Sequence, residues 1–142
     1  MNDSQLIWEA YGEMPGYADT TWQDTVDGQV VKITMQDVEA MLNQLKVPQQ
    51  GTPVPTSKIA HLDIHTKHKD SKSPEEQQAT YDRAMKADMS FAIIASMKDG
   101  VYNMILDGNH RLHKAVATGV DTINVRTLDL SQTPPDWQHV FR

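Results

Sequence analysis

The sequence predicts an α+β fold, in which a small mixed sheet is flanked by helices, and three observations support this class. Two β-rich stretches surround turn signals at Asp27-Gly28 and at Lys98-Asp99-Gly100, as in β-hairpins. Apolar residues recur at helical spacing in several separate segments. The length of 142 residues fits one domain with a single modest core.

The first 55 residues are expected to form a helix and a hairpin ahead of the main sheet. Residues 4–13 have apolar side chains at helical spacing, and "TWQDTVDGQVVKIT" reads as a hairpin. Thr34 is a good N-cap for the helix that follows, which ends before Pro48. The apolar face of that helix comprises Val38, Met41, Leu42 and Leu45. The Pro-rich stretch "VPQQGTPVPT" is then predicted to be a loop.

The middle of the chain is predicted to contribute a strand and a helix. "KIAHLDIH" alternates between apolar and polar residues, which predicts a strand with His61, Asp63 and His65 on one face. The next helix has strong start signals, with Ser73 at the N-cap and Pro74 at the first helical position, and it is expected to run to about residue 86.

The last third is predicted to form a hairpin, a helix and a returning strand. "SFAIIASM" and "VYNMILD" are the two hairpin strands. Leu112, Ala115 and Val116 form one face of a helix, and Gly119 is placed to end it. "TINVRTLDL" returns as a strand, and the tail "TPPDWQHVFR" adds about one helical turn.

Composition narrows the classes of function. Apolar residues make up 39% and charged residues 23%, as in globular proteins, and the formal net charge of −6 argues against duplex DNA as a partner. The chain has no cysteine, which excludes disulfides, thiolate metal sites and cysteine nucleophiles, and predicts a cytoplasmic location. Apolar runs such as "FAIIASM" are too short for a membrane span, and "MNDSQLIWEAYGEM" lacks the features of a signal peptide.

The stretch "ILDGNHRLHKA" places Asp107, Gly108, Asn109, His110 and Arg111 between an apolar strand and a helix. Free backbone N–H groups at a helix start carry partial positive charge and bind anions. His110 and Arg111 add donors at the same place, and Asp107 is placed to hold Mg2+, orient a hydroxyl or pin the loop. The pattern predicts a phosphate-binding turn. Residue types alone leave open an ordinary Asp-Gly turn with a surface arginine.

"ILDGNHRLHKAVATGVDTINV" resembles the signature of the ParB/sulfiredoxin superfamily, which reads apolar strand, Asp-Gly-x-His-Arg, Ala-containing helix, Gly, apolar strand. "SKIAHLDIH", the Ser73 helix and the hairpin "SFAIIASMKDGVYNMILDG" resemble its preceding elements. The resemblance implies a single domain with a ParB/sulfiredoxin-like core at 56–130, an N-terminal extension at 1–55 and a tail at 131–142.

In that superfamily the Gly-x-His-Arg turn binds nucleotide phosphates. The resemblance therefore implies that the phosphates contact Gly108, Asn109, His110 and Arg111, with Asp107 leading into the turn. His61 and Asp63 are implied to border the same pocket. Ser71 and Lys72, at the start of the next helix, are a further candidate anion site.

Two members of the superfamily are disfavoured by this sequence. Sulfiredoxins place a reactive cysteine before the His-Arg pair, where this chain has Asn109, so sulfinic acid repair by that mechanism is excluded. Chromosome-partitioning ParB proteins add a helix-turn-helix domain, and the residues after Leu130 are too few for one. Nuclease activity, which is also attached to the family name, ranks lower because the sequence shows no dense carboxylate cluster.

Two functions remain as expectations. The first is an ATP-dependent phosphotransferase or nucleotide hydrolase, similar to the family's free serine kinases, acting on a small-molecule or nucleotide acceptor. Its catalytic residues are then Asp107, His110 and Asp63, with Mg2+ at Asp107. The second is a non-catalytic nucleotide- or protein-binding module. Compact proteins of this type also occur in bacteriophages, and a phage copy would be expected to modify nucleotides or DNA, or to act on a host protein, in the host cytoplasm.

Other polar and aromatic groups of the sequence are expected to be structural. Histidines and aspartates in "HLDIHTKHKD" suit Zn2+ or Mn2+, but their spacing matches no metalloenzyme signature, and a polar strand face is the preferred interpretation. His113 is expected at the surface. Trp8, Trp22 and Trp137 are expected in the core rather than in a base-binding slot. The apolar stripe of "LIWEAYGEM" is expected to dock onto its own sheet or onto a second subunit.

Overall fold

The computed structural model describes residues 20–142 and confirms the α+β class. The predicted helix at 4–13 lies outside the described residues. The strands are β1 (Thr21–Val26), β2 (Gln29–Thr34), β3 (Thr52–Pro55), β4 (Ile93–Lys98), β5 (Val101–Asp107) and β6 (Thr122–Asp129). The α-helices are α2 (Met35–Gln44), α3 (Ile64–Lys67), α4 (Pro74–Met85), α5 (Asn109–Thr118) and α6 (Pro135–Val140). Within these residues no helix is long and apolar enough to cross a membrane.

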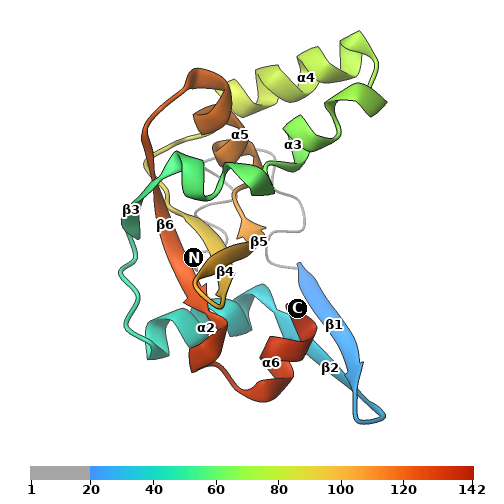
Figure 1. Cartoon of the computed structure of the whole chain (residues 1–142), viewed down its shortest axis with the longest axis vertical. Coiled ribbons are helices and arrows are strands. Elements are labelled where there is room, and N and C mark those ends of the chain that lie inside the picture. Colours follow the sequence, from blue (N-terminus) through green and yellow to red (C-terminus); the bar gives the residue numbers. More distant parts are fainter. Residues whose placement is uncertain (1–19) are drawn as a thin grey trace.

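The main sheet has four strands in the order β3-β6-β4-β5 (Figure 1). β4 pairs with β5 as an antiparallel hairpin, and β3 pairs with β6 in the same way. β4 and β6 are parallel neighbours, because α5 carries the chain from the β5 edge across β4 to β6. The sheet is therefore mixed, as the sequence predicts.

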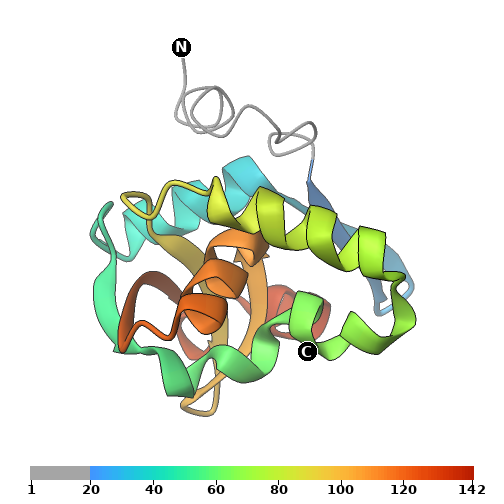
Figure 2. The ribbon, with the colours of Figure 1, turned by 90° about the horizontal axis from the view of Figure 1, so that it is seen from above.

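Apolar side chains pack on both faces of the sheet. Ile93 and Ala95 of β4 face α5, where they meet Leu112 and Ala115. Ile94, which points to the opposite face, packs in a second core with residues of α2, the β1–β2 hairpin and α6. Figure 2 shows α5 and α2 on opposite sides of the sheet. The central strands are thus buried between helices, which accounts for their continuous apolar run.

The predicted turns and caps at both hairpins and helices are confirmed. β1 and β2 pair across Asp27 and Gly28, which both adopt positive φ angles. The hydroxyl of Thr34 accepts a hydrogen bond from the backbone N–H of Asp37 and so caps α2. Trp22 packs edge-on to Phe141, with 5.4 Å between ring centroids, and belongs to the core as expected.

The predicted strand over "KIAHLDIH" is wrong. The chain forms two 3₁₀ turns, Thr56–Lys58 and Ala60–Leu62, and then enters α3. The Asp63 carboxylate accepts hydrogen bonds from the backbone N–H groups of His65 at 3.1 Å and Thr66 at 3.3 Å. Because the chain turns before Asp63 and this side chain then caps a helix start, no strand forms here, and the expected shared strand face of His61, Asp63 and His65 does not exist.

A short strand lies instead within the predicted Pro-rich loop. β3 contains Pro53 and Pro55, which have no backbone N–H to donate. It forms an edge of the sheet, where proline is tolerated because only one side needs a partner.

Candidate functional site

The strand–turn–helix at 107–111 forms as predicted, and its turn requires glycine. β5 ends at Asp107, Gly108 has φ 103°, and α5 begins at Asn109. A Cβ atom at position 108 would lie 2.5 Å from Cγ2 of Ile93, which is closer than any real contact. Both the positive φ angle and the close packing on β4 therefore exclude a side chain here.

Asp107 and Arg111 form a buried ion pair beneath this turn. Nη2 of Arg111 donates to Oδ2 of Asp107 at 2.6 Å. Nη1 donates to the carbonyl oxygens of Ala92 at 2.6 Å and Phe91 at 3.2 Å, just before β4. Burial raises the pKa of Asp107, and the Arg111 guanidinium acts against that rise. The pair ties the turn to the neighbouring strand.

This geometry decides which predicted roles the two side chains fit. Arg111 is 2% exposed and Asp107 is 6% exposed. A phosphate would have to break the ion pair to reach the guanidinium, and Mg2+ would have to break it to reach the carboxylate. Asp107 therefore does not fit a magnesium ligand. Among the described residues no group of three or more His, Asp or Glu side chains is placed to hold a metal ion.

Three histidines gather beside the start of α5. The rings of His65 and His110 are stacked, with 4.8 Å between centroids, and His113 meets His65 edge-on at 5.4 Å. Burial lowers the pKa of His65 to about 4, and the nearby positive charges of His110, Lys72 and His113 act in the same direction. The contact between His65 and His110 joins α3 to the predicted phosphate-binding turn.

Asp63 and His113 form a second buried pair. Nδ1 of His113 lies 2.9 Å from Oδ2 of Asp63, which is 2% exposed, and the hydroxyl of Thr66 donates to the same oxygen at 2.7 Å. Burial works to raise the pKa of Asp63, but the hydrogen bonds from His113 and Thr66 outweigh it and the pKa is lowered. The Asp63 carboxylate is therefore hydrogen-bonded to residues of both α3 and α5.

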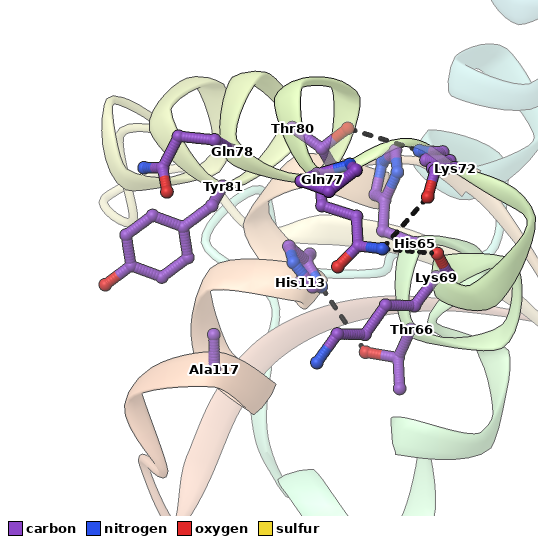
Figure 3. Close-up of a pocket in the computed structure, with 11 residues that line it drawn as sticks. His65, Thr66, Lys69, Lys72, Gln77, Gln78, Thr80, Tyr81, His113 and Ala117 are labelled. Atoms are coloured by element: carbon purple, nitrogen blue, oxygen red, sulfur yellow. Dashed lines mark hydrogen bonds between the residues drawn. The ribbon is translucent and has the colours of Figure 1, made fainter.

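A cavity of about 490 Å³ opens between the 64–72 segment, α4 and α5 (Figure 3). Its charged and titratable lining residues are His65, Lys69, Lys72 and His113, and its other polar ones are Thr66, Gln77, Gln78, Thr80 and Tyr81. Nζ of Lys72 donates to Oγ1 of Thr80 at 3.2 Å, so this ammonium group bridges the loop and α4. We call this cavity the cationic pocket.

The lining of this pocket differs in charge from the chain as a whole. Lys69 and Lys72 line it and no Asp or Glu does, whereas the chain carries a net charge of −6. The side-chain amide of Gln77 donates to the carbonyl oxygens of Lys69 at 2.9 Å and Lys72 at 3.0 Å. These hydrogen bonds hold the lysine-bearing loop against α4, so the positive charge has a fixed position.

The structure separates the sequence-predicted site residues. Lys72 lines the cationic pocket, and His110 adjoins it through His65. Asn109 is half-buried at the first position of α5. Nε2 of His61 instead donates to the carbonyl oxygen of Tyr102 at 2.9 Å, and the hydroxyl of Ser71 donates to the carbonyl oxygen of His68 at 2.8 Å. Neither His61 nor Ser71 lines this pocket.

Of the residues that line the pocket, only Lys72 was predicted from the sequence as a site residue, and those that were missed include His65, Lys69, Tyr81 and His113. His113 was expected at the surface, but its side chain is only 15% exposed. The spacing of three residues between His110 and His113 was the available signal, since such residues share a helix face.

Comparisons of the chain with protein-family models, curated proteins and solved structures give no match.

Proposed function

We propose that this chain is a nucleotide-binding protein of the ParB/sulfiredoxin-like type, which binds ATP or another nucleoside triphosphate and transfers or hydrolyses its terminal phosphate. The observation that carries the proposal is the cationic pocket, in which Lys69, Lys72 and two histidines line one cavity of an acidic protein. The resemblance of residues 107–111 to a nucleotide-binding turn supports the same conclusion, because that turn adjoins the pocket.

The pocket suits a phosphate-bearing small molecule in size and chemistry. Its volume of about 490 Å³ falls within the usual range for small-molecule sites. Ammonium groups of Lys69 and Lys72 form charge-assisted hydrogen bonds with phosphate oxygens. Tyr81, which is 45% exposed on α4, offers an aromatic face for a base.

The proposal differs from the sequence-based expectation in the groups that it uses. Arg111 and Asp107 hold the turn and are assigned no contact with the nucleotide. The phosphates are assigned to Lys72, His110 and the first turn of α5, whose dipole favours negative charge. No step is assigned to a divalent cation.

One observation favours the alternative of a binding module without catalysis. The buried Asp107–Arg111 pair removes from the surface the two charged side chains that the turn was expected to present. A protein that only binds nucleotide needs the pocket and not those charges. This alternative predicts that bound nucleotide is released unchanged.

Titration calorimetry with ATP, CTP, GTP, ADP and adenosine tests the binding proposal. We expect one triphosphate to bind, ADP to bind more weakly and adenosine to give no measurable heat. Lys72→Glu should weaken binding by about tenfold or more, because a charged hydrogen bond is replaced by repulsion. Lys98→Glu is the matched control. Lys98 is an exposed residue at the end of β4, where it pairs with Val101 at the start of β5, and the Gly108 turn follows the other end of β5. Equal affinity of the two variants, or no binding of any nucleotide, would contradict the proposal.

A further inference from the structure

We infer that His113, held in place by Asp63, is the group that accepts a proton from the attacking hydroxyl in the cationic pocket. This inference rests on the proposed function, which does not itself name a base. It assigns His113 as a catalytic residue and Asp63 as the residue that positions it.

The hydrogen bonds of the pair define which nitrogen of His113 is the base. Nδ1 lies 2.9 Å from a carboxylate oxygen of Asp63, and an ionised carboxylate can only accept. Nδ1 therefore carries the proton of the neutral ring, and Nε2 keeps the lone pair. The same logic applies wherever an aspartate orients a catalytic imidazole.

Asp63 is itself held rigidly. Its carboxylate accepts from the hydroxyl of Thr66 at 2.7 Å and from two backbone N–H groups at the start of α3. With 2% of its surface exposed, it cannot reach a substrate in the pocket. This placement changes the role expected for Asp63 from direct catalysis to positioning.

His113 lies where a bound nucleotide would meet it. It lines the cationic pocket from α5, one helical turn after His110, and its side chain is 15% exposed (Figure 3). No hydrogen-bond acceptor or donor for Nε2 occurs among the described residues. The buried nitrogen is thus paired and the other nitrogen is left for a ligand.

The second imidazole of the pocket is a poorer base. Nε2 of His65 is buried and has no hydrogen-bond partner among the described residues, and no carboxylate orients this ring. Burial lowers the pKa of His65 to about 4, so the neutral ring binds a proton weakly. His65 instead packs between His110 and His113 and fixes their relative positions.

The step balances without any further reagent. A hydroxyl oxygen, from water or an alcohol, forms a bond to the γ-phosphorus while the bond from that phosphorus to the β,γ-bridging oxygen breaks. The electron pair leaves with the bridging oxygen on the nucleoside diphosphate. The hydroxyl proton moves to Nε2 of His113, the resulting imidazolium is stabilised by the Asp63 carboxylate, and the proton then passes to solvent.

The test measures ATP turnover and ATP binding on the same set of proteins, with water and free serine as acceptors. His113→Asn keeps an N–H that can donate to Asp63 but removes the base, and His113→Gln is the second variant. Both should lower kcat by about 100-fold or more while ATP affinity changes by less than about threefold. His68→Gln is the control, because His68 is exposed and does not line the pocket.

The Asp63→Asn variant distinguishes the role of Asp63 in orienting His113 from its role in capping α3. An asparagine can still cap α3, but it removes the charge that selects the Nδ1–H form of His113. We expect a loss in kcat with KM nearly unchanged, because Asp63 orients the base and does not contact the nucleotide. Thermal melting of each variant checks that it folds.

The outcomes distinguish this inference from the binding proposal. Failure of the wild type to bind any nucleotide overturns the proposed function. Binding without turnover of ATP overturns the inference and leaves the binding proposal standing. Turnover that is equal in the wild type and both His113 variants also overturns the inference.

Discussion

Oδ2 of Asp107 lies 2.6 Å from Nη2 of Arg111, and the two side chains are 5% and 2% exposed. The pair spans the Gly108 turn, and the same guanidinium binds two carbonyl oxygens ahead of β4. The most conspicuous charges of the sequence motif therefore stabilise the fold. We propose that ligand binding and catalysis depend on neighbouring residues, namely Lys72, His110 and His113.

Removal of Arg111 should leave a buried carboxylate without its partner. We expect Arg111→Ala to lower the free energy of unfolding by about 3–5 kcal/mol, measured by urea titration. Arg142→Ala is the matched control, because its ion pair with Asp24 is exposed and is worth about 0–1 kcal/mol. Similar losses in the two variants would show that the buried pair does not stabilise the turn.

A double variant tests whether the loss in free energy of unfolding in Arg111→Ala arises from the unpaired carboxylate of Asp107. Replacing both partners, with Asp107→Leu and Arg111→Met together, removes both charges at once. This double variant should lose less free energy of unfolding than Arg111→Ala alone, because no buried charge is left unpaired. A larger loss would mean that the hydrogen bonds to Phe91 and Ala92 matter more than the ion pair.

Gly108→Ala should destabilise the protein more than Gly28→Ala. Both glycines have positive φ angles, 103° and 81°, so both substitutions carry backbone strain of about 1 kcal/mol. Only at Gly108 does the new methyl group also clash with Ile93, whereas nothing lies within 4 Å at Gly28. Thermal unfolding of the two variants measures the difference, and equal melting temperatures would contradict the packing of this turn on β4.

Stability should depend on pH through His65. The pKa of this ring falls from 6.5 to about 4 in the folded protein, so the unfolded chain binds more protons between these values. The free energy of unfolding should therefore decrease as the pH is lowered from about 6.5 to about 4. His65→Gln should show a shallower decrease in urea titrations across this range. Asp63 loses its stabilising contribution only below pH 3.8. The raised pKa of Asp107 acts in the opposite sense above pH 3.8, and comparison of the wild type with His65→Gln cancels this contribution because both proteins keep Asp107.

Local signals were sufficient to predict most of the elements from the sequence. The Asp27-Gly28 turn, the Thr34 and Ser73 caps and the glycines at 108 and 119 all lie at the predicted element ends. Each of these features depends on backbone conformations that few residues adopt, so the residue identity is informative. β4 and β6 are parallel because both run antiparallel to β5, which α5 connects to β6.

The features that could not be predicted from the sequence depend on contacts between distant segments. Alternation over "KIAHLDIH" is typical of a strand, but Asp63 accepts hydrogen bonds from the backbone of His65 and Thr66 and pairs with His113, and α3 begins here. The same contacts bring together the walls of the cationic pocket, whose lining residues His65 and His113 lie far apart in the sequence. The pattern within one segment carries no information on such pairs.

The measurement that tests the central claim most directly is an NMR titration of the isotopically labelled protein with ATP, following backbone amide and histidine ring signals. Nucleotide binding in the cationic pocket predicts that the largest shifts fall on residues 65–72, on Asn109 and His110 and on His113. Signals of the β1–β2 hairpin should stay unchanged, since it lies on the opposite face of the sheet. Saturable shifts confined to other surfaces, or no shifts at millimolar ATP, would contradict the account.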